Sequence, residues 1–160
     1  MLPKHARDYL VTGMEAAPWV LRAILAGIAP DDPRWDARRD PERFTLREIT
    51  AHLADWEMIF LDRLKRTRSE NQPILQGLDE GKLVIDGDYA HADPAACLQR
   101  YAEGRARMLA FARSLGAEEW ARSGTHTDLG MVTIEAQLVH ISGHDGYHLL
   151  QAMQWLGVAP

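Results

Sequence analysis

Hydrophobic residues recur along this chain at helical spacing, at positions i, i+3, i+4 and i+7, in four long segments. The segments extend from about His5 to Ile28, from Leu46 to Arg68, from Asp93 and Pro94 to Leu115 and Gly116, and from Thr133 to Leu156 and Gly157. Each combines one apolar stripe with polar residues elsewhere, so each predicts an amphipathic helix with one buried face. Four such helices can bury their stripes only against one another, which predicts an all-α fold, a four-helix bundle.

Capping signals mark the expected starts of two of these helices. Thr45 stands at the N-cap position of the second segment, and Glu48, three residues further on, completes a capping box. In the third segment, Asp93 is an N-cap residue, and Pro94 occupies the first helical position, where a missing backbone N–H costs nothing. The second and third helices are therefore expected to begin at these residues.

Two connecting segments complete the expected fold. The segment from Ser69 to Ala92 holds one proline and three glycines, but a structureless stretch of that length is uncommon in a compact domain, so we expect a short helix or a functional role there. The segment from Ala117 to Met131 reads as a loop, and no part of the chain shows the alternation of a solid β-strand. We expect a single domain over residues 1–160, with a long crossover between the second and third helices rather than simple up-down connectivity throughout.

The composition is that of an ordinary globular domain, with 46% hydrophobic and 26% charged residues among 160. Its 18 basic residues are outnumbered by 23 acidic ones, and no basic stripe is interleaved with aromatics, so nucleic-acid binding is disfavoured. The apolar stretches are shorter than the roughly 20 residues that span a bilayer, and the N-terminus lacks a secretory signal, so we expect no membrane span and a cytoplasmic protein. The single cysteine, Cys97, excludes an intramolecular disulfide and is expected to be an inert core residue.

Three histidines stand at four-residue intervals in the fourth segment, within the sequence HISGHDGYHLLQ. His140, His144 and His148 should therefore lie one above the next on a helix, where neighbouring imidazoles can share one metal ion. With 7 histidines in 160 residues, chance would give only about 0.01 such triplets. This spacing points to a metal site more strongly than any single histidine could.

The histidines differ in their positions relative to the apolar stripes. His148 falls inside the edge of its stripe, His144 somewhat outside it and His140 farthest out, while His52 lies at the rim of the buried face of the second helix. A histidine pair from one helix and a third histidine from a facing helix can form a three-imidazole site with open coordination positions, as in catalytic metal sites. The alternative for each is an ordinary histidine at the edge of the core, hydrogen-bonded to a neighbour. His140 points away from the stripe, so we expect it at the surface or beside a ligand rather than on the metal.

Other polar residues near this pattern have candidate roles. Asp145 projects from the apolar side of its helix, where an ionised carboxylate needs a partner. It could orient a metal-binding imidazole such as His52, and pairing with Arg63 is an equally physical alternative. Gln151 lies on the histidine side of the same helix and can hydrogen-bond a ligand or a bound water. Among the remaining histidines, His126 is the best candidate for a chemical role, because its loop leads into the fourth helix.

The histidines stand in two motifs, ITAHLADWEMIFLDRL around His52 and LVHISGHDGYHLLQAMQWLG around His144 and His148. Together with a mid-helix Ala-Pro in the first segment and a Gly-x-Val-Thr turn ending at Thr133, these motifs resemble the DinB-like (YfiT-type) superfamily. The resemblance covers essentially the whole chain. It implies a metal-binding four-helix bundle, often a homodimer, whose three metal ligands fall on His52, His144 and His148.

What the resemblance implies about activity is a class of reaction. Some members of the superfamily resemble thiol S-transferases or isomerases that act with a low-molecular-weight thiol such as bacillithiol, and others have been called metal-dependent hydrolases. Our leading hypothesis is a metal-dependent thiol S-transferase acting on a small-molecule substrate. The alternatives are a hydrolase that uses a metal-bound hydroxide, assisted by Asp145 or Glu57, and a non-catalytic stress-response bundle that binds metal or a small ligand. Imidazole ligands suit Zn, Ni and Fe alike, so the cofactor is predicted only as a divalent transition metal.

Overall fold

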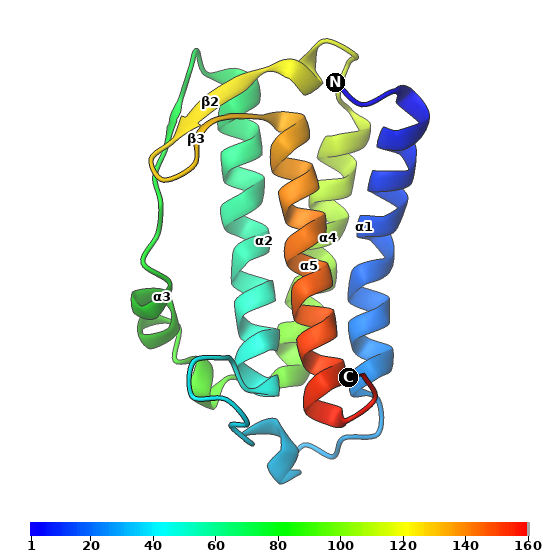
Figure 1. Cartoon of the computed structure of the whole chain (residues 1–160), viewed down its shortest axis with the longest axis vertical. Helices are drawn as coiled ribbons and strands as arrows, with labels where there is room; N and C mark the ends of the chain where they lie inside the picture. Colours follow the sequence, from blue (N-terminus) through cyan, green and yellow to red (C-terminus); the bar gives the residue numbers. More distant parts are fainter. Residues whose placement is uncertain (160) are drawn as a thin grey trace.

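Four long helices stand side by side in the computed structural model, which describes residues 1–159 (Figure 1). They are α1 (Lys4–Leu25), α2 (Leu46–Ser69), α4 (Pro94–Arg113) and α5 (Ile134–Leu156). The predicted four-helix bundle is confirmed, although α1 ends earlier than expected, where Gly27 adopts a φ of 86°. Within the described residues, none of the helices is both long and apolar enough to cross a membrane.

Local capping sets the boundaries of the two helices that carry the histidine motifs. At the start of α2, the Glu48 N–H donates to Thr45 Oγ1 at 3.2 Å and the Thr45 N–H donates to Glu48 Oε2 at 2.8 Å. At the start of α5, Thr133 Oγ1 accepts from the Ala136 N–H at 3.0 Å, and Gly157 ends the helix with a φ of 72°. Each cap satisfies a backbone group that has no partner inside the helix, so local sequence sets the start of both helices and the end of α5.

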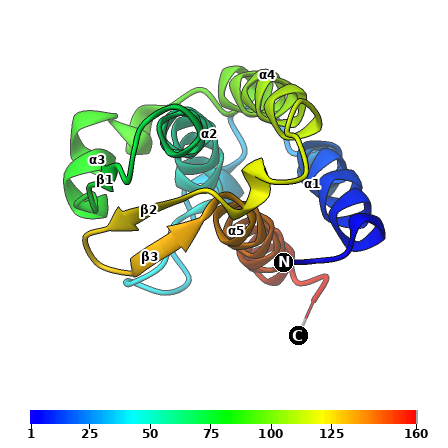
Figure 2. The ribbon, with the colours of Figure 1, turned by 90° about the horizontal axis from the view of Figure 1, so that it is seen from above.

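Each helix of the bundle packs against two others (Figure 2). α1 contacts α4 and α5, and α2 contacts the same two helices. The course of the chain in Figure 1 shows that α2 and α4 run in the same direction, opposite to α1 and α5. This arrangement requires the chain to return along the outside of the bundle between α2 and α4. The expected long crossover is therefore confirmed.

The crossover has regular structure of its own. It contains the strand β1 (Ile74–Leu75), the short helix α3 (Glu80–Asp86) and the 3₁₀ turn η2 (Tyr89–His91). The Asp79 side chain caps α3, but none of the residues of α3 is buried. Tyr89, by contrast, is buried against the bundle. The expected short helix is present, and its partly buried Leu83 and Val84 pack against the two apolar clusters of the bundle.

The prediction of a plain loop from Ala117 to Met131 is wrong. This segment contains the 3₁₀ turn η3 (Glu119–Ala121), the strand β2 (Ser123–His126) and the start of β3 (Gly130–Thr133). β1 pairs in parallel with β2, and β2 pairs antiparallel with β3, so the crossover is joined to this hairpin in one small sheet. Figure 2 shows the sheet outside the bundle, beside α2 and α5. Strands this short carry too few positions for an alternating pattern to be recognised.

Apolar side chains fill the bundle in two clusters. One gathers around Trp56 and Phe60, and the other around Ile49. Cys97 is buried in the second cluster, as expected. Along α4, the buried Arg105 separates residues of one cluster from residues of the other. The bundle therefore has a polar group between its two apolar halves.

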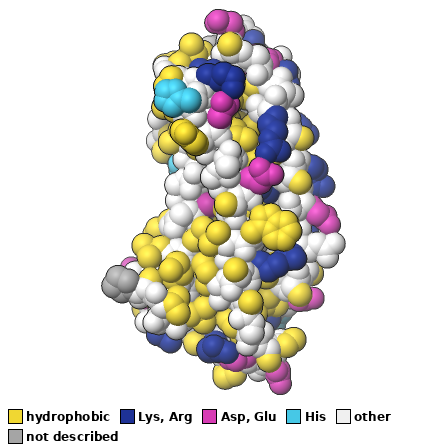
Figure 3. Space-filling model, turned by 90° about the vertical axis from the view of Figure 1, so that its right-hand side faces the viewer, with side chains coloured by type: hydrophobic (Ala, Val, Ile, Leu, Met, Phe, Trp, Pro, Cys, Tyr) yellow, Lys and Arg dark blue, Asp and Glu magenta, His cyan; other side chains and the backbone are white. Residues whose placement is uncertain are grey.

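Hydrophobic side chains also remain on the surface of α1. Figure 3 shows that hydrophobic side chains gather on the lower half of the face on which α1 lies. The large exposed residues of this helix include Tyr9, Val20 and Trp19, the last with 67% of its surface accessible. A contiguous apolar surface is typical of a contact with another protein.

Candidate metal site

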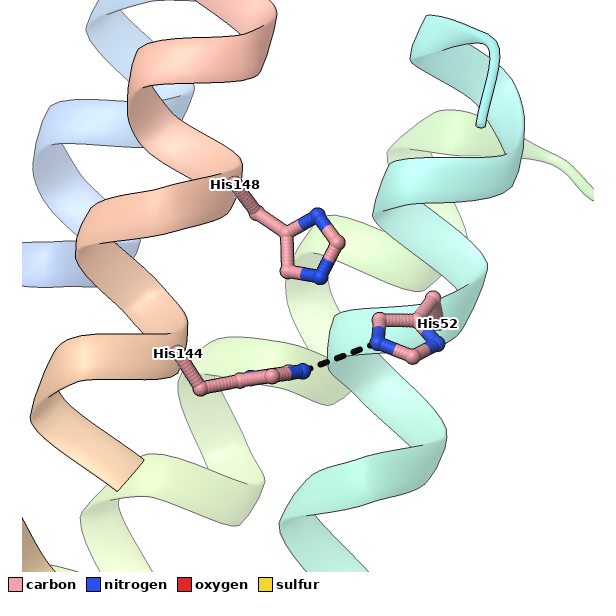
Figure 4. A group of neighbouring side chains, drawn as sticks. All are labelled: His52, His144 and His148. Carbon is pink, nitrogen blue, oxygen red and sulfur yellow. Dashed lines mark hydrogen bonds between the residues drawn. The ribbon is translucent and has the colours of Figure 1, made fainter. Parts of the chain in front are cut away.

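Three histidines meet between α2 and α5 (Figure 4). One ring nitrogen from each of His52, His144 and His148 lies within 4.8 Å of the other two. The Nε2 atoms of His52 and His144 are 2.9 Å apart. His144 and His148 project from successive turns of α5, and His52 projects towards them from an early turn of α2. The structure thus brings together the three histidines that the sequence singled out.

The three imidazoles are neutral at physiological pH. Burial, reinforced by the other two histidines, lowers the pKa of His52 to about 2. Burial, reinforced by His148 and His140, lowers the pKa of His144 to about 3. Burial also lowers the pKa of His148 to about 4, although a hydrogen bond to Gln151 acts in the opposite direction. A neutral imidazole offers a free lone pair, which is the form that binds a metal ion.

Hydrogen bonds orient the ring of His148. Gln151 Nε2 donates to the carbonyl oxygen of Phe44 at 2.8 Å, which leaves its Oε1 to accept from His148 Nδ1 at 3.1 Å. The proton of His148 therefore lies on Nδ1, and its Nε2 carries the lone pair. This is the support that a metal-binding imidazole usually receives from a neighbouring acceptor. The expectation that Gln151 hydrogen-bonds a ligand residue agrees with this contact.

The donor set fits a transition-metal ion. Metal-to-nitrogen bonds of about 2.0–2.1 Å around a tetrahedral centre place two ligand nitrogens roughly 3.3 Å apart, and the His52 and His144 nitrogens are already at 2.9 Å. Without a metal, one of these two nitrogens would have to serve as the donor to the other. His52 Nδ1 is also buried without a hydrogen-bond partner in the described part of the chain. An ion shared by the three rings would use the lone pairs that the protein leaves facing one another.

The two predicted partners of Asp145 are wrong. Its carboxylate neither orients His52 nor pairs with Arg63; Oδ2 accepts from Arg105 Nη1 at 2.6 Å, and Oδ1 accepts from the Tyr101 hydroxyl at 2.8 Å. An arginine on a third helix satisfies the charge instead, which a helical-wheel argument about two helices could not reveal.

Glu57, the other carboxylate proposed to assist catalysis, belongs to the same buried ion pair network. Its Oε1 accepts from Arg105 Nη2 at 2.5 Å. Burial raises the pKa of Glu57 to about 7, against the opposing effect of Arg105. Neither Glu57 nor Asp145 lines the cavity at the histidines. Both side chains instead lie in the polar group that separates the two apolar clusters.

A cavity of about 230 Å³ opens onto the three histidines. Besides them it is lined by Glu42, Arg43, Phe44, Glu80, Tyr147 and Gln151. Glu80 comes from α3 in the crossover, where a short helix or a functional role was expected, but no sequence pattern marks Glu80 or Glu42 individually. An acidic residue at the start of a short helix is ordinary in a sequence, and only the folded crossover brings this carboxylate to the site.

His140 and His126, which the sequence also singled out, lie outside the cluster. His140 is exposed, as expected from its position on the helix, and its ring contacts the edge of Phe60 at a centroid distance of 5.9 Å. His126 is buried on β2 and lines a neighbouring cavity. Trp56 and Phe60 lie between that cavity and the metal site, since their rings approach the ring of His144 at 5.9 and 5.6 Å.

The fold and the histidine site together define a known class of protein: the chain belongs to the DinB superfamily, whose sequence profile matches residues 14–152. It is 26% identical over 149 residues to the Bacillus subtilis (strain 168) protein named "Putative metal-dependent hydrolase YfiT", an alignment that covers 92% of this chain and 83% of that protein. A solved structure of YfiT from Bacillus subtilis, described as a probable metal-dependent hydrolase with an unusual four-helix bundle topology, matches with a TM-score of 0.88 at 24% identity. That match covers 98% of this chain and 91% of the YfiT chain. The resemblance to the DinB-like (YfiT-type) superfamily is confirmed.

Proposed function

We propose that this protein is a metal-dependent hydrolase whose divalent transition metal is held by His52, His144 and His148. The observation that carries the proposal is the convergence of three buried, neutral imidazole nitrogens within 4.8 Å of one another. Three protein ligands leave at least one coordination position for water or substrate, as catalytic sites require. Zn, Ni and Fe all suit this ligand set.

The residues around the site are suited to hydrolysis of a small ester or amide. A divalent ion held there would lower the pKa of a water molecule and polarise a substrate oxygen. Glu80 and Glu42 line the same cavity and supply carboxylates that can accept a proton from the attacking water or return one to the leaving group. Phe44 and Tyr147 line the same cavity and offer aromatic surface to an apolar part of a substrate. The name of the Bacillus subtilis relative supports the same class of reaction.

Thiol S-transfer is the second candidate, favoured by the charge of the ligand set. Three neutral imidazoles leave the ion its full double positive charge, which stabilises a thiolate as readily as it activates water. The chain's cysteine, Cys97, is buried away from the site, so the thiol would be an external low-molecular-weight molecule such as bacillithiol.

Metal analysis followed by two substrate panels tests the proposal. Protein purified without an affinity tag should contain about one transition metal per chain. Wild type should turn over members of a panel of small esters and amides, His144→Ala should lose this activity, and the matched His140→Ala variant should keep it. Turnover only when a thiol and an electrophile are both supplied would replace hydrolysis with thiol transfer. Silence in both panels with metal bound would leave a non-catalytic metal-binding bundle.

A further inference from the structure

A second cavity, of about 190 Å³, adjoins the metal site on the side of the small sheet. α2 and the first turns of α5 form its inner wall, and β1 and the β2–β3 hairpin form its outer wall. Figure 2 shows the sheet and α3 on this side of the bundle. The inner wall includes Trp56 and Phe60, which also contact the ring of His144. Glu80 lines both cavities. A single small molecule could therefore occupy both.

Arg63 contributes a buried cation to this cavity. The residue is only 9% exposed, and its Nη2 donates to the carbonyl oxygen of Gln76 at 2.7 Å. The guanidinium also lies over the ring of Trp56, at 5.4 Å from the ring centroid. Within residues 1–159, Arg63 forms no salt bridge, whereas the buried Arg105 pairs with two carboxylates. Burying an arginine without a directly paired anion is costly, so an anion that entered the cavity would be favoured.

His126 adds a second hydrogen-bond donor. Its Nδ1 accepts from the Asp128 N–H at 3.2 Å, so the neutral ring carries its proton on Nε2. Burial, together with the neighbouring charge of Arg63, lowers the pKa of His126 and keeps the ring neutral. One guanidinium and one neutral N–H donor suit the two oxygens of a carboxylate.

The remaining walls determine the size and charge of the ligand. Leu75, Val132 and the ring of Phe60 are apolar, and the indole of Trp56 is apolar apart from its Nε1–H, which has no hydrogen-bond partner within the described residues. The volume of about 190 Å³ is comparable to the roughly 150 Å³ of an engineered apolar cavity that accommodates benzene. The carboxylates of Glu80 and Asp128 also line the cavity, and they would repel a dianion more strongly than a monoanion. The cavity therefore suits a monocarboxylate with a small aromatic or branched apolar body.

We propose that this second cavity is the substrate-recognition subsite, and that it binds the carboxylate of a substrate through Arg63 and His126 while Trp56 and Phe60 pack against its apolar body. The inference rests on the proposed function, because it assumes that the rest of the substrate reaches the metal at His144. It assigns the substrate class as small ester or amide compounds that carry a free carboxylate beyond an apolar spacer. The subsite itself uses none of the metal ligands.

Binding of benzoate, with neutral benzamide as its isostere, tests the subsite directly. Ligand-observed NMR titrations should show that wild type binds benzoate in preference to benzamide, and that Arg63→Gln weakens benzoate binding roughly tenfold or more, the effect of losing one charge-assisted hydrogen bond. Arg66→Gln is the matched control, because Arg66 lies on the same helix outside this cavity, and it should bind benzoate as wild type does. His126→Gln should weaken binding severalfold. Circular dichroism checks that each variant is folded, and Arg63→Lys, which keeps the charge, should bind more tightly than Arg63→Gln.

Repeating the titrations after metal removal, and in His144→Ala, separates this inference from the proposed function. The subsite predicts that benzoate affinity is retained without metal and still depends on Arg63. Benzoate binding that requires metal and ignores Arg63→Gln would place the carboxylate on the metal and overturn the subsite, while the hydrolase proposal would stand. Arg63-dependent binding in a protein that takes up no metal would refute the hydrolase and retain the subsite. Equal binding of benzoate and benzamide, or no binding of either by wild type, would overturn the subsite.

Discussion

Arg105 connects all four helices of the bundle, and its replacement should be strongly destabilising. The residue is 1% exposed and lies on α4. Its Nη1 donates to the carbonyl oxygen of Met14 on α1 at 2.7 Å, and it forms salt bridges with Glu57 on α2 and Asp145 on α5. Arg105→Met would remove the guanidinium and leave two carboxylates buried without a cation.

The size of the destabilisation follows from the number of buried charges that lose their partner. Removing one partner of a buried ion pair costs about 3–5 kcal/mol, because the other charge stays buried. Two carboxylates remain here, but Glu57, whose pKa burial raises to about 7, can take up a proton. We therefore expect a loss within that range at neutral pH. For a chain of 160 residues, each kcal/mol moves Tm by roughly 2–4 °C, so Tm should fall by roughly 6–20 °C.

Thermal and urea unfolding followed by circular dichroism measure this loss. Arg100→Met is the control on the same helix, since Arg100 is exposed and pairs with Asp55 at the surface, and it should cost less than about 1 kcal/mol. Adding Glu57→Gln and Asp145→Asn to Arg105→Met removes the buried charges and should recover part of the loss. An Arg105→Met protein within about 1 kcal/mol of wild type would show that the network does not carry the stability assigned to it.

Three further predictions concern metal, pH and assembly. Zinc at a hundred times its Kd should stabilise wild type by about 2.7 kcal/mol, which thermal unfolding would detect as a rise in Tm. His140→Ala should show the same rise in Tm as wild type. A rise of the same size in His144→Ala would contradict the assignment of His144 as a metal ligand. Because burial raises the pKa of Glu57 from 4.5 to about 7, the folded chain holds this proton more tightly than the unfolded chain. Its contribution to the free energy of unfolding is therefore fully present below about pH 4.5 and is lost as the pH rises to about 7. Urea unfolding should show a pH dependence in this window that Glu57→Gln removes; identical profiles for the two proteins would contradict the assignment. We also expect a homodimer, with a sedimentation mass twice the 18.0 kDa of the chain. Trp19→Glu should shift the sedimentation mass towards that of a single chain, because the new charge lies in the exposed apolar surface of α1. A single-chain mass for wild type across a broad concentration range would contradict the dimer.

Features that depend on interactions within one helical turn could be predicted from the sequence. Thr45 and Glu48 cap α2 through groups three residues apart, and the spacing of His144 and His148 places both rings on one side of α5. In these two cases the signal and its structural result lie close together in the chain. The contact of His52 with the histidines of α5 is remote in the chain, and it was predicted from its position at the rim of an apolar stripe together with the family resemblance.

Features that depend on pairing between remote segments could not be predicted. The sheet forms because Ile74 pairs with Thr125, and neither segment identifies the other in a single sequence. Asp145 needed a cation, but helical periodicity on two helices could not show that Arg105 of a third helix supplies it. Glu80 reaches the metal site only because the crossover folds back over α2 and α5.

The attachment of α3 to the bundle allows the residues of α3 that line the site to vary in sequence, while the helices that carry the histidines stay the same. α3 buries none of its residues, and the chain is held before it by β1 and after it by the buried Tyr89. Substitutions of the exposed residues of α3 can alter the charge and shape presented to both cavities through Glu80 without disturbing the helices that carry the histidines. This segment is therefore a natural place to exchange residues, by divergence or by design, when a new substrate is sought for an unchanged metal-binding scaffold.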